Sequence, residues 1–284
     1  MQKYSLSNIT CKLRDKFLSY EVSHKHDFKQ YQKNDVIEIL RVIYKYFKNP
    51  KKITVLDFGC SAVVDKYLAK HVKKIVGINV NKDYLNISSP ARNMELLVMD
   101  GEKLAFAEKT FDFIYSTNVY EHVGNFSQCL DEQLRVLKNN GYCYARWEPL
   151  WSSQRGHHMH DDMARDWEKF IKIEETPYQN NGRFIEDWAH LLLSQEEMAE
   201  NLGLKLGNAR LSQKMADYVY LSKDINRLFF EDFEKILSAK KIIIDFWKKR
   251  VKQPPPDILK KLRSKHPYED FGTCSCDILF HKVL

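Results

Sequence analysis

The stretch KITVLDFGC at residues 52–60 decides the fold, together with KIVGINV at residues 74–80. Each is a short apolar run with β-branched residues, which is typical of a strand, and the first reaches Gly59, where a chain can turn sharply. Residues 65–71 between them have a helical pattern, so the predicted order is strand, turn, helix, strand. Two strands joined by such a crossover are expected to lie parallel in one sheet.

The same alternation continues on both sides of this unit. An amphipathic helix is predicted at residues 35–47, where apolar side chains recur at i, i+3 and i+4. Further strands are predicted at residues 95–99, 111–116 and 141–147, with a helix at 126–137 before the last of them. Strands that alternate with helices at this spacing indicate an α/β fold with a parallel, doubly wound sheet.

Beyond residue 149 the alternation stops. After it we expect a helix at 194–202, in which Ser194 caps the start and Glu197 lies three residues on, and then a strand near 204–212. A basic amphipathic helix is predicted at 229–251 and an edge strand at 276–284. The chain is thereby divided into a helical N-terminal extension (1–50), a Rossmann-like core (51–150), a cap segment rich in aromatic residues and histidine (151–193), and a part that completes the core and carries the basic helix as an insertion (194–284).

The composition is that of a folded globular protein. Of 284 residues, 44% are hydrophobic and 29% are charged, which excludes an intrinsically disordered chain. No apolar run is long enough to span a membrane and charges interrupt the first residues, so we expect a cytoplasmic protein without a secretory leader. The net charge of +7 comes mostly from lysine, because only 12 of the 45 basic residues are arginines, and it is interpreted as a solvated surface.

The cysteines are predicted to be free thiols. Six cysteines in a chain of this length, without a secretory signal, do not indicate a disulfide framework. The one close pair has a single residue between its members, which is not a zinc-ligand spacing. The six are Cys11, Cys60, Cys129, Cys143, Cys274 and Cys276.

Five segments, in this order and spacing, resemble the class I S-adenosylmethionine-dependent methyltransferases, particularly the subgroup that acts on small molecules and sugars. The resemblance covers roughly residues 51–148. It implies a seven-stranded Rossmann-like sheet, with S-adenosylmethionine as the cofactor bound by the core. The segments are VLDFGC at 55–60, VGINV at 76–80, VMDGEKLAF at 98–106, FDFIYSTNVYEHV at 111–123 and LRVLKNNGY at 134–142.

The resemblance also implies a set of cofactor-binding residues at the strand ends. The methionine end of the cofactor would lie at the first strand, the ribose at the second, the adenine at the third, and the substrate side of the methionine at the fourth. Acidic and carbonyl groups suit this ligand, because it carries a sulfonium and an ammonium cation. In that order the residues are Asp57, Gly59 and Cys60; Asn79; Asp100, Gly101 and Glu102; and Asn118.

Three positions depart from the family pattern. Ser61 and Val63 stand where the glycine-rich loop has its second and third glycines, so the backbone is less free there. Asn79 replaces an acidic residue, and a carboxamide makes a weaker hydrogen bond to a ribose hydroxyl than a carboxylate does, by about 1–2 kcal/mol.

Residues 147–162 follow the fifth strand, where the methyl acceptor is expected. His157 and His158 are the candidate general bases, because a histidine with a pKa near neutrality can take the proton of an acceptor hydroxyl. Arg155 and Arg183 are candidates for gripping a phosphate or carboxylate on the substrate. His122 is interpreted as structural. No metal site is predicted, although His157, His158, His160, Asp161 and Asp162 lie close together in the sequence.

The segment after the fifth strand and the resemblance favour O-methylation of a small molecule such as a sugar, a nucleotide-sugar or a surface-polysaccharide precursor. The expected partner is a small-molecule acceptor of the sugar or phosphate-bearing kind. The sugar class rests on the W-x-P-x-W-S-S…G-H-H segment, which resembles methyltransferases of glycan biosynthesis. Two alternatives stay open. One is an RNA methyltransferase, although the motifs for methylating base amines or carbon 5 are absent and nucleic acid is an unexpected partner. The other is a binding protein that kept the fold and lost turnover. The sequence does not predict an oligomeric state.

Overall fold

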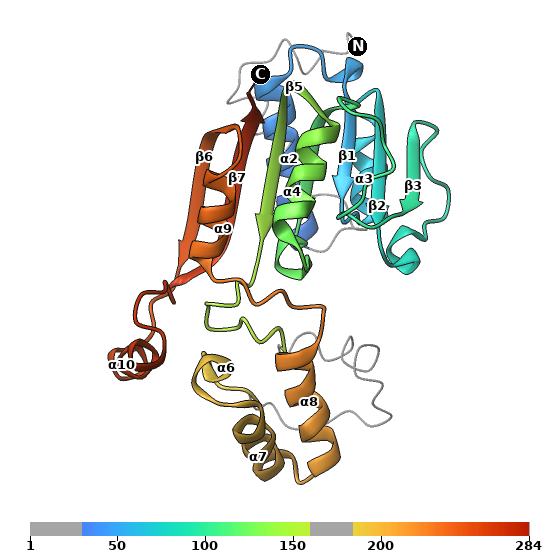
Figure 1. Cartoon of the computed structure of the whole chain (residues 1–284). Helices are drawn as coiled ribbons and strands as arrows, with labels where there is room; N and C mark the ends of the chain where they lie inside the picture. The colour runs from blue at the N-terminus through green and yellow to red at the C-terminus, as the bar shows by residue number, and fades with distance from the viewer. Residues whose placement is uncertain (1–29, 160–183, 284) are drawn as a thin grey trace.

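The protein is known here from a computed structural model, which describes residues 30–159 and 184–283 (Figure 1). The description of the N-terminal extension therefore begins at residue 30, and the description of the cap segment leaves out residues 160–183. The α-helices are α2 (Gln30–Tyr46), α3 (Ala62–Leu68), α4 (Phe126–Val136), α6 (Ala189–Leu192), α7 (Gln195–Leu206), α8 (Ala209–Leu221), α9 (Phe230–Ser238) and α10 (Pro256–Lys265). The strands are β1 (Thr54–Phe58), β2 (Lys74–Asn79), β3 (Met94–Val98), β4 (Phe111–Thr117), β5 (Leu137–Trp147), β6 (Ile242–Val251) and β7 (Thr273–Lys282).

All seven strands form one sheet in the order β3-β2-β1-β4-β5-β7-β6. Strands β1 to β5 are mutually parallel, and β7 runs antiparallel to both β5 and β6. The Rossmann-like seven-stranded α/β fold expected from the sequence is confirmed, and the sheet is mixed because its last two strands form an antiparallel pair.

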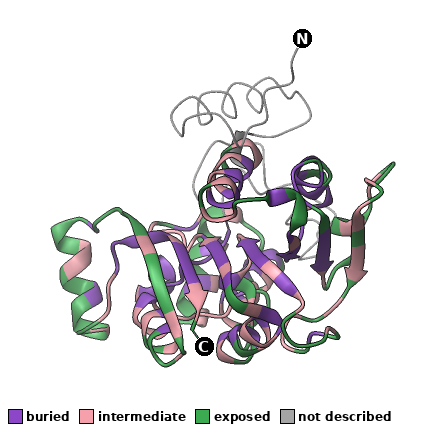
Figure 2. Ribbon diagram, turned by 90° about the horizontal axis from the view of Figure 1, so that it is seen from above, coloured by how far each residue is buried: buried purple, intermediate pink, exposed green. Residues whose placement is uncertain are grey.

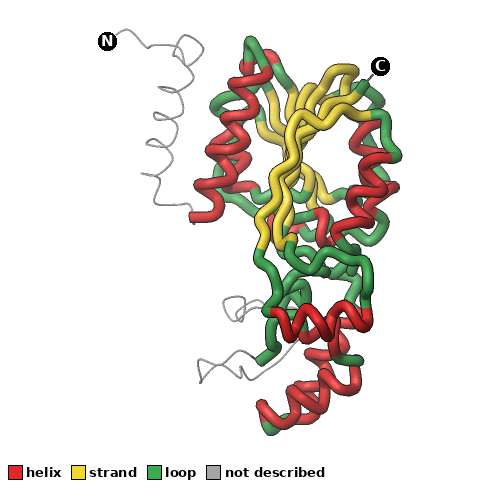
Figure 3. The backbone as a smooth tube through the Cα atoms, turned by 90° about the vertical axis from the view of Figure 1, so that its left-hand side faces the viewer, coloured by secondary structure: helices red, strands yellow, loops and turns green. Residues whose placement is uncertain are grey.

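Helices cover both faces of the sheet (Figure 3). Helices α2 and α3 pack on one face, where Ile39 and Leu68 meet inward residues of β1, β2 and β4. Helices α4 and α9 pack on the other face, where Phe126 and Phe233 join a cluster with Trp147. The central strands are accordingly buried and the outer strands are more exposed (Figure 2). Burial on both faces explains why β1 and β2 read as continuous apolar runs.

The predicted basic helix at 229–251 is wrong in its second half. Helix α9 ends at Ser238, and residues 242–251 form β6, which pairs with β7 from Ile242 to Val251. The run IIIDFWKKRV offers apolar side chains at both helical and strand spacing, so periodicity alone does not separate the two states. Pairing with β7, which is distant in sequence, decides for the strand.

Two further predictions in this part of the chain are corrected. The strand expected near 204–212 is helical: α7 ends at Leu206 and is capped by Gly207, whose φ of +65° suits glycine, and α8 begins directly after Asn208. The C-terminal strand β7 is an interior strand, because β6 covers the side that the prediction left free. The predicted start of α7 is confirmed, since Ser194 and Glu197 form a reciprocal capping box.

A helical lobe, made of α6, α7, α8 and α10, has a hydrophobic core of its own. Trp188, Met215 and Leu262 are buried together in it. Figure 1 shows α6, α7 and α8 beyond the end of β5 where the chain leaves that strand. Trp188 Nε1 donates to the carbonyl of Phe271, 3.0 Å away, which ties the lobe to the segment before β7. Among the described residues, no helix has the length and apolarity needed to cross a membrane.

The interior position of β7 predicts that the same substitution, isoleucine to alanine, lowers the free energy of unfolding more on β7 than on β6. Ile278→Ala removes a side chain that is fully buried on β7, so it should lower the free energy of unfolding by about 2–5 kcal/mol. Ile243→Ala, on the outer strand β6 with a half-exposed side chain, should cost less than about 1 kcal/mol. Urea unfolding of both variants measures the difference, and equal costs would contradict the burial of β7.

Candidate functional site

The turn after β1 is fixed by one carbonyl group of β2. The backbone amides of Gly59 and Cys60 both donate to the carbonyl oxygen of Ile78, at 3.0 and 2.7 Å. Gly59 has a φ of +85°, and a Cβ on it would lie 2.2 Å from Cγ2 of Val119. Only glycine therefore allows the turn to approach the end of β4 this closely.

Asn79 and Cys60 lie against each other across this turn. Nδ2 of Asn79 donates to the carbonyl of Cys60 at 3.2 Å, and its Oδ1 accepts from the amide of Asn81 at 2.9 Å. The carboxamide thus makes a hydrogen bond at each end, and the second N–H of Nδ2 and the second lone pair of Oδ1 are what it can offer a ligand. The Cys60 side chain is buried beside Asp57 and Asp65, so what Cys60 can offer a ligand is its backbone.

The segment after β3 lies beside the end of β1. A Cβ on Gly101 would be 2.1 Å from Cζ of Phe58, so the Phe58 ring fills the space between the two strand ends. Oδ1 of Asp100 accepts from the amide of Glu102 at 2.9 Å, which shapes a tight turn. Oε1 of Glu102 accepts from the amide of Asn125 at 2.7 Å, so this carboxylate also holds the start of α4.

Asn118 directly follows β4 and has a φ of +55°. Its amide donates to the carbonyl of Arg146 on β5 at 2.8 Å, while its Oδ1 is buried with no hydrogen-bond partner in the described part of the chain. A buried acceptor oxygen without a donor is costly unless a ligand supplies one. The eight positions named from the sequence thus lie at one edge of the sheet, at the carboxyl ends of β1 to β4.

The residues at this edge fit S-adenosylmethionine chemically. They offer the buried Asp57 carboxyl, the unpaired Asn118 oxygen and the exposed carboxylate of Asp100, all of which are acceptors for a cationic ligand that carries hydroxyl and amino donors.

Glu121 is a buried carboxyl group one turn beyond Asn118. Its side chain is 2% exposed, and Oε2 has no hydrogen-bond partner among residues 30–159 and 184–283. Oε1 accepts from the amide of Glu148 at 3.4 Å and lies 4.0 Å from Nε2 of His122. Burial raises the pKa of Glu121 well above its usual value, and the charge of Arg146 opposes this only in part. Sequence reasoning did not assign this group a role, although it stands next to His122 in the motif.

His157 and His158 are adjacent in sequence but lie in different surroundings. The His158 ring lies beside the ring of His122, with 5.0 Å between centroids, and His122 is in turn the neighbour of Glu121. The His157 ring faces His190 at 5.5 Å, and its Nδ1 accepts from the amide of Met159 at 3.1 Å. Burial lowers the pKa of His190 to about 4, so the partner of His157 is neutral. His158 lies at the strand ends, and His157 packs into the helical lobe.

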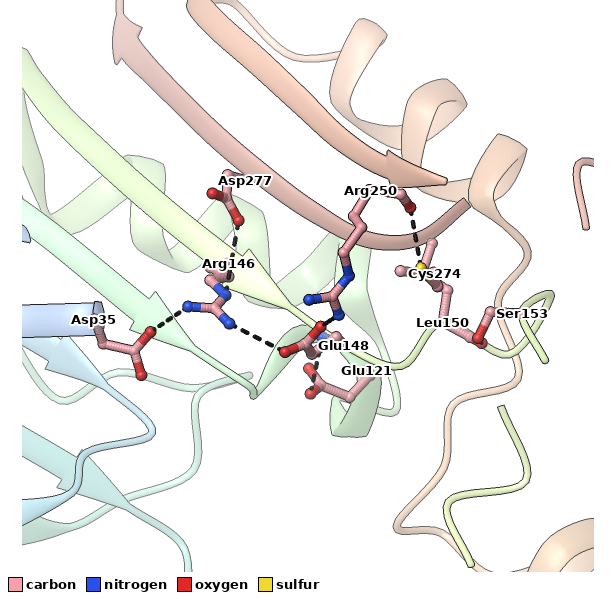
Figure 4. A network of polar contacts seen from close by, with 9 residues as sticks. All are labelled: Asp35, Glu121, Arg146, Glu148, Leu150, Ser153, Arg250, Cys274 and Asp277. Atoms are coloured by element: carbon pink, nitrogen blue, oxygen red, sulfur yellow. Dashed lines mark hydrogen bonds and ion pairs between the residues drawn. The ribbon is translucent and has the colours of Figure 1, made fainter. Parts of the chain in front are cut away.

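An ionic network joins the site to three other elements. Figure 4 shows the Arg146 guanidinium between Asp35 of α2, Glu148 and Asp277 of β7, at 2.7, 3.1 and 3.8 Å. Glu148 also pairs with Arg250 of β6. Burial raises the pKa of Asp35 to about 6, against the lowering effect of Arg146. The network anchors α2 to the sheet next to the cofactor edge.

The remaining sequence candidates are less informative. Arg155 is partly buried at the start of the cap segment. Arg183, His160, Asp161 and Asp162 lie outside the described residues. The sequence did not signal the role of Asp35 or Arg146, because their pairing joins positions 111 residues apart.

The seven-stranded sheet with flanking helices, in which β7 is antiparallel to both of its neighbours, is consistent with a Rossmann-like methyltransferase fold. Comparison with known proteins places the chain more closely. Residues 56–145 match the family model described as a methyltransferase domain. The chain thus carries a domain of the class I S-adenosylmethionine-dependent methyltransferases, and S-adenosylmethionine is the cofactor of that domain.

Two curated relatives match part of the chain. An uncharacterized protein of Methanocaldococcus jannaschii is 32% identical over 111 residues, which is 37% of this chain and 45% of that protein. A ubiquinone biosynthesis O-methyltransferase of Pelagibacter ubique is 26% identical over 173 residues, or 51% of this chain and 66% of that protein. The matches therefore span less than two thirds of either relative.

Among solved structures, the [4+2]-cyclase SpnF is similar with a TM-score of 0.50 at 12% identity, covering 96% of this chain and 94% of that one. A methyltransferase structure from Bacillus halodurans has a TM-score of 0.49 at 14% identity, covering 88% of this chain and all of the other. At these identities the likeness concerns the fold alone.

The burial of Glu121 predicts a dependence of stability on pH. A carboxyl whose pKa is raised by folding contributes stability below its unfolded pKa, and this contribution is lost as pH rises towards the folded pKa. Glu121→Gln should therefore gain stability relative to the parent as pH rises from 5 to 8, by at most about 1.4 kcal/mol per pH unit. Chemical unfolding at several pH values measures this gain. The same change at Glu200, which is exposed on α7, is the matched control and should show no such trend.

Proposed function

We propose that the protein transfers a methyl group from S-adenosylmethionine to an oxygen atom of a small molecule. The observation that carries this proposal is a group of proton acceptors beyond Asn118: the neighbouring rings of His122 and His158, with the buried carboxyl of Glu121 beside His122. Methylating a hydroxyl requires that its proton be removed as the new bond forms, so such a group is needed where the acceptor lies.

The cofactor is assigned to the strand ends as the family resemblance implies. Asp57 and the Gly59 backbone would hold the methionine end, Asn79 the ribose, and Asp100 with Gly101 and Glu102 the adenine. Asn118 would border the methionine and the acceptor. When bound, the cofactor supplies a methyl group activated by its sulfonium charge. The chain's own contribution is to supply acceptor oxygens to that cation and to orient it towards the end of β4.

His158 is the general base in this proposal. It lies on the cap segment next to His122, whereas His157 points into the helical lobe. The pKa of His122 is lowered from its usual value by partial desolvation, so near pH 7 this ring adds no positive charge that would oppose protonation of His158. Burial raises the pKa of Glu121, which favours the neutral form of this carboxyl beside His122.

The proposal extends to the class of acceptor. The relative named as a ubiquinone biosynthesis O-methyltransferase favours an oxygen acceptor. The W-x-P-x-W-S-S…G-H-H segment favours a sugar, a nucleotide-sugar or a polysaccharide precursor, and the partly buried Arg155 could pair with its phosphate.

One observation favours a different function. Asn79 makes a hydrogen bond within the protein at both ends of its carboxamide, and the similar fold of a [4+2]-cyclase shows that the architecture serves other reactions. A methyltransferase-fold protein that binds a ligand without methyl transfer is therefore the second candidate.

Two measurements separate the candidates. Calorimetry with S-adenosylmethionine and S-adenosylhomocysteine should show micromolar binding, and no binding at millimolar ligand would contradict the assigned cofactor site. A screen with tritiated S-adenosylmethionine across nucleotide sugars, glycan fragments, quinol precursors and RNA should label an oxygen of a small molecule. Binding without labelling of any acceptor would favour the second candidate, and labelling of RNA alone would replace the acceptor class.

The opposite orientations of the two histidines predict unequal effects on turnover. His158→Ala should lower kcat by about 10²-fold or more, because it removes the proton acceptor, while the affinity for S-adenosylhomocysteine stays nearly the same. His157→Ala is the matched control. It should lower the free energy of unfolding, and its effect on kcat should be smaller than that of His158→Ala. The two variants are compared by methyl-transfer kinetics and urea unfolding. If His157→Ala slows transfer and His158→Ala does not, the base is misassigned.

A further inference from the structure

Two aspartates are buried side by side beneath the turn after β1. Asp57 on β1 is 3% exposed and Asp65 on α3 is fully buried. One oxygen of each carboxyl lies, with Sγ of Cys60, in a group whose atoms are all within 4.8 Å of one another. Two ionised carboxylates this close in a dry interior would repel each other strongly.

The groups that surround the pair bring no positive charge. From β4, the Tyr115 hydroxyl donates a hydrogen bond to Oδ1 of Asp65. From β2, Gly77 leaves room for the pair, because a Cβ there would lie 2.4 Å from Oδ2 of Asp65 and 2.6 Å from Sγ of Cys60. Leu96 closes the β3 side near Gly77. In the described part of the chain, no lysine or arginine acts on either carboxyl.

The protonation of these groups follows from burial and from their proximity. Burial and the charge of Asp65 raise the pKa of Asp57 well above its usual value, and burial raises the pKa of Asp65 to about 6. Burial also raises the pKa values of Cys60 and Tyr115, so neither ionises near neutral pH. Because two ionised carboxylates at this separation would repel each other, the pair favours a state with one negative charge and one proton.

We propose that Asp57 and Asp65 share this proton, and that Asp65 is a positioning residue that acts through Asp57 to hold residues 58–61 in the shape that binds the cofactor. Asp57 in turn accepts a hydrogen bond from the Ser61 backbone. The positioning role rests on the proposed function, because it needs the cofactor at this turn.

The departures from the glycine-rich loop explain why such a device is useful here. Ser61 and Val63 replace glycines, so the backbone has less freedom to adopt the turn by itself. The Val63 side chain is 38% exposed and does not fill the core under the turn. The Asp57–Asp65 link joins the end of β1 to the first turn of α3, on the two sides of the loop. It leaves one negative charge beneath the site of a cationic ligand.

Two variants and a control test the shared proton and the positioning role. Asp65→Asn keeps the shape and lets the carboxamide donate to Asp57, whereas Asp65→Leu removes the link. Asp257→Asn, on the exposed start of α10, is the matched control. Infrared difference spectra at pH 7.5 detect protonated carboxyl groups in the protein without ligand, and calorimetry measures the dissociation constant for S-adenosylhomocysteine.

The shared proton predicts that the parent protein has a protonated-carboxyl band that is lost in Asp65→Asn and kept in Asp257→Asn. The positioning role predicts that Asp65→Leu weakens S-adenosylhomocysteine binding by about tenfold or more, while Asp65→Asn stays within about threefold of the parent. Tyr115→Phe removes a hydrogen bond that stabilises the ionised form of Asp65. The protonated-carboxyl band of this variant should therefore persist to higher pH than the band of the parent. This variant decides the proton question if the Asp65 variants do not fold.

Three outcomes overturn the inference. The first is an unchanged band in Asp65→Asn, or no shift of the band in Tyr115→Phe, which excludes the shared proton. The second is unchanged affinity in Asp65→Leu, which excludes the positioning role. The third is a rise in the melting temperature of the parent when a stoichiometric amount of Zn²⁺ is added, if Asp65→Asn abolishes this rise. That result assigns the cluster to a metal. If the parent itself does not bind S-adenosylhomocysteine, the proposed function and the positioning role fail together, while the infrared band still decides whether the proton is shared.

Discussion

The double hydrogen bond from Gly59 and Cys60 to the Ile78 carbonyl is the constraint on which the site depends. These two bonds end β1 at Phe58 and turn the chain away from the sheet. They also pair the Ile78 carbonyl of β2 with the turn. Because Gly59 has no side chain, Val119 can close in from β4. The positions that follow β1, β2, β3 and β4 thus share one small region, as parallel strands require when their carboxyl ends are in register.

Acidic groups with raised pKa values gather around this region. Asp57 and Asp65 lie beneath the turn, Glu121 lies beyond β4, and Asp35 meets Arg146 from the opposite helix. In each of these carboxyls, burial is the largest cause of the shift, and only Asp35 and Glu121 have a nearby cation to oppose it. A raised pKa favours the neutral form of each of these carboxyls, which reduces the cost of burying them. The site still has acceptor oxygens for a positively charged cofactor.

The helical lobe brings the acceptor side of the site to the sheet. Its connection to β5 runs through residues 148–159, and the backbone and side chain of Asn226 donate to the carbonyls of Glu121 and Tyr120 at 3.1 and 2.6 Å. His158 is held where this connection passes the end of β4. The proposed cofactor half of the site is therefore built from strand ends, and the proposed acceptor half is built from the contact between sheet and lobe.

The sequence by itself determined the first five strands, the turn at Gly59, the start of α7 at Ser194 and the positions at the strand ends. These features depend on neighbours within a few residues: on local hydrophobic periodicity, on a backbone conformation that one residue type allows, and on a side chain that caps its own helix. The family resemblance added which ligand these strand ends hold.

Only the tertiary structure decided the features that depend on distant partners. Residues 242–251 are a strand because β7 pairs with them, and β7 is interior because β6 covers it. His157 and His158 point to different neighbours, which no spacing along one chain predicts. Asp65 occupies an apolar position of α3, three residues from Ala62 and three from Leu68, so the sequence hinted that it was unusual. Its carboxyl acquires a role only because folding packs α3 against β1, where a buried charge must find a proton or a partner.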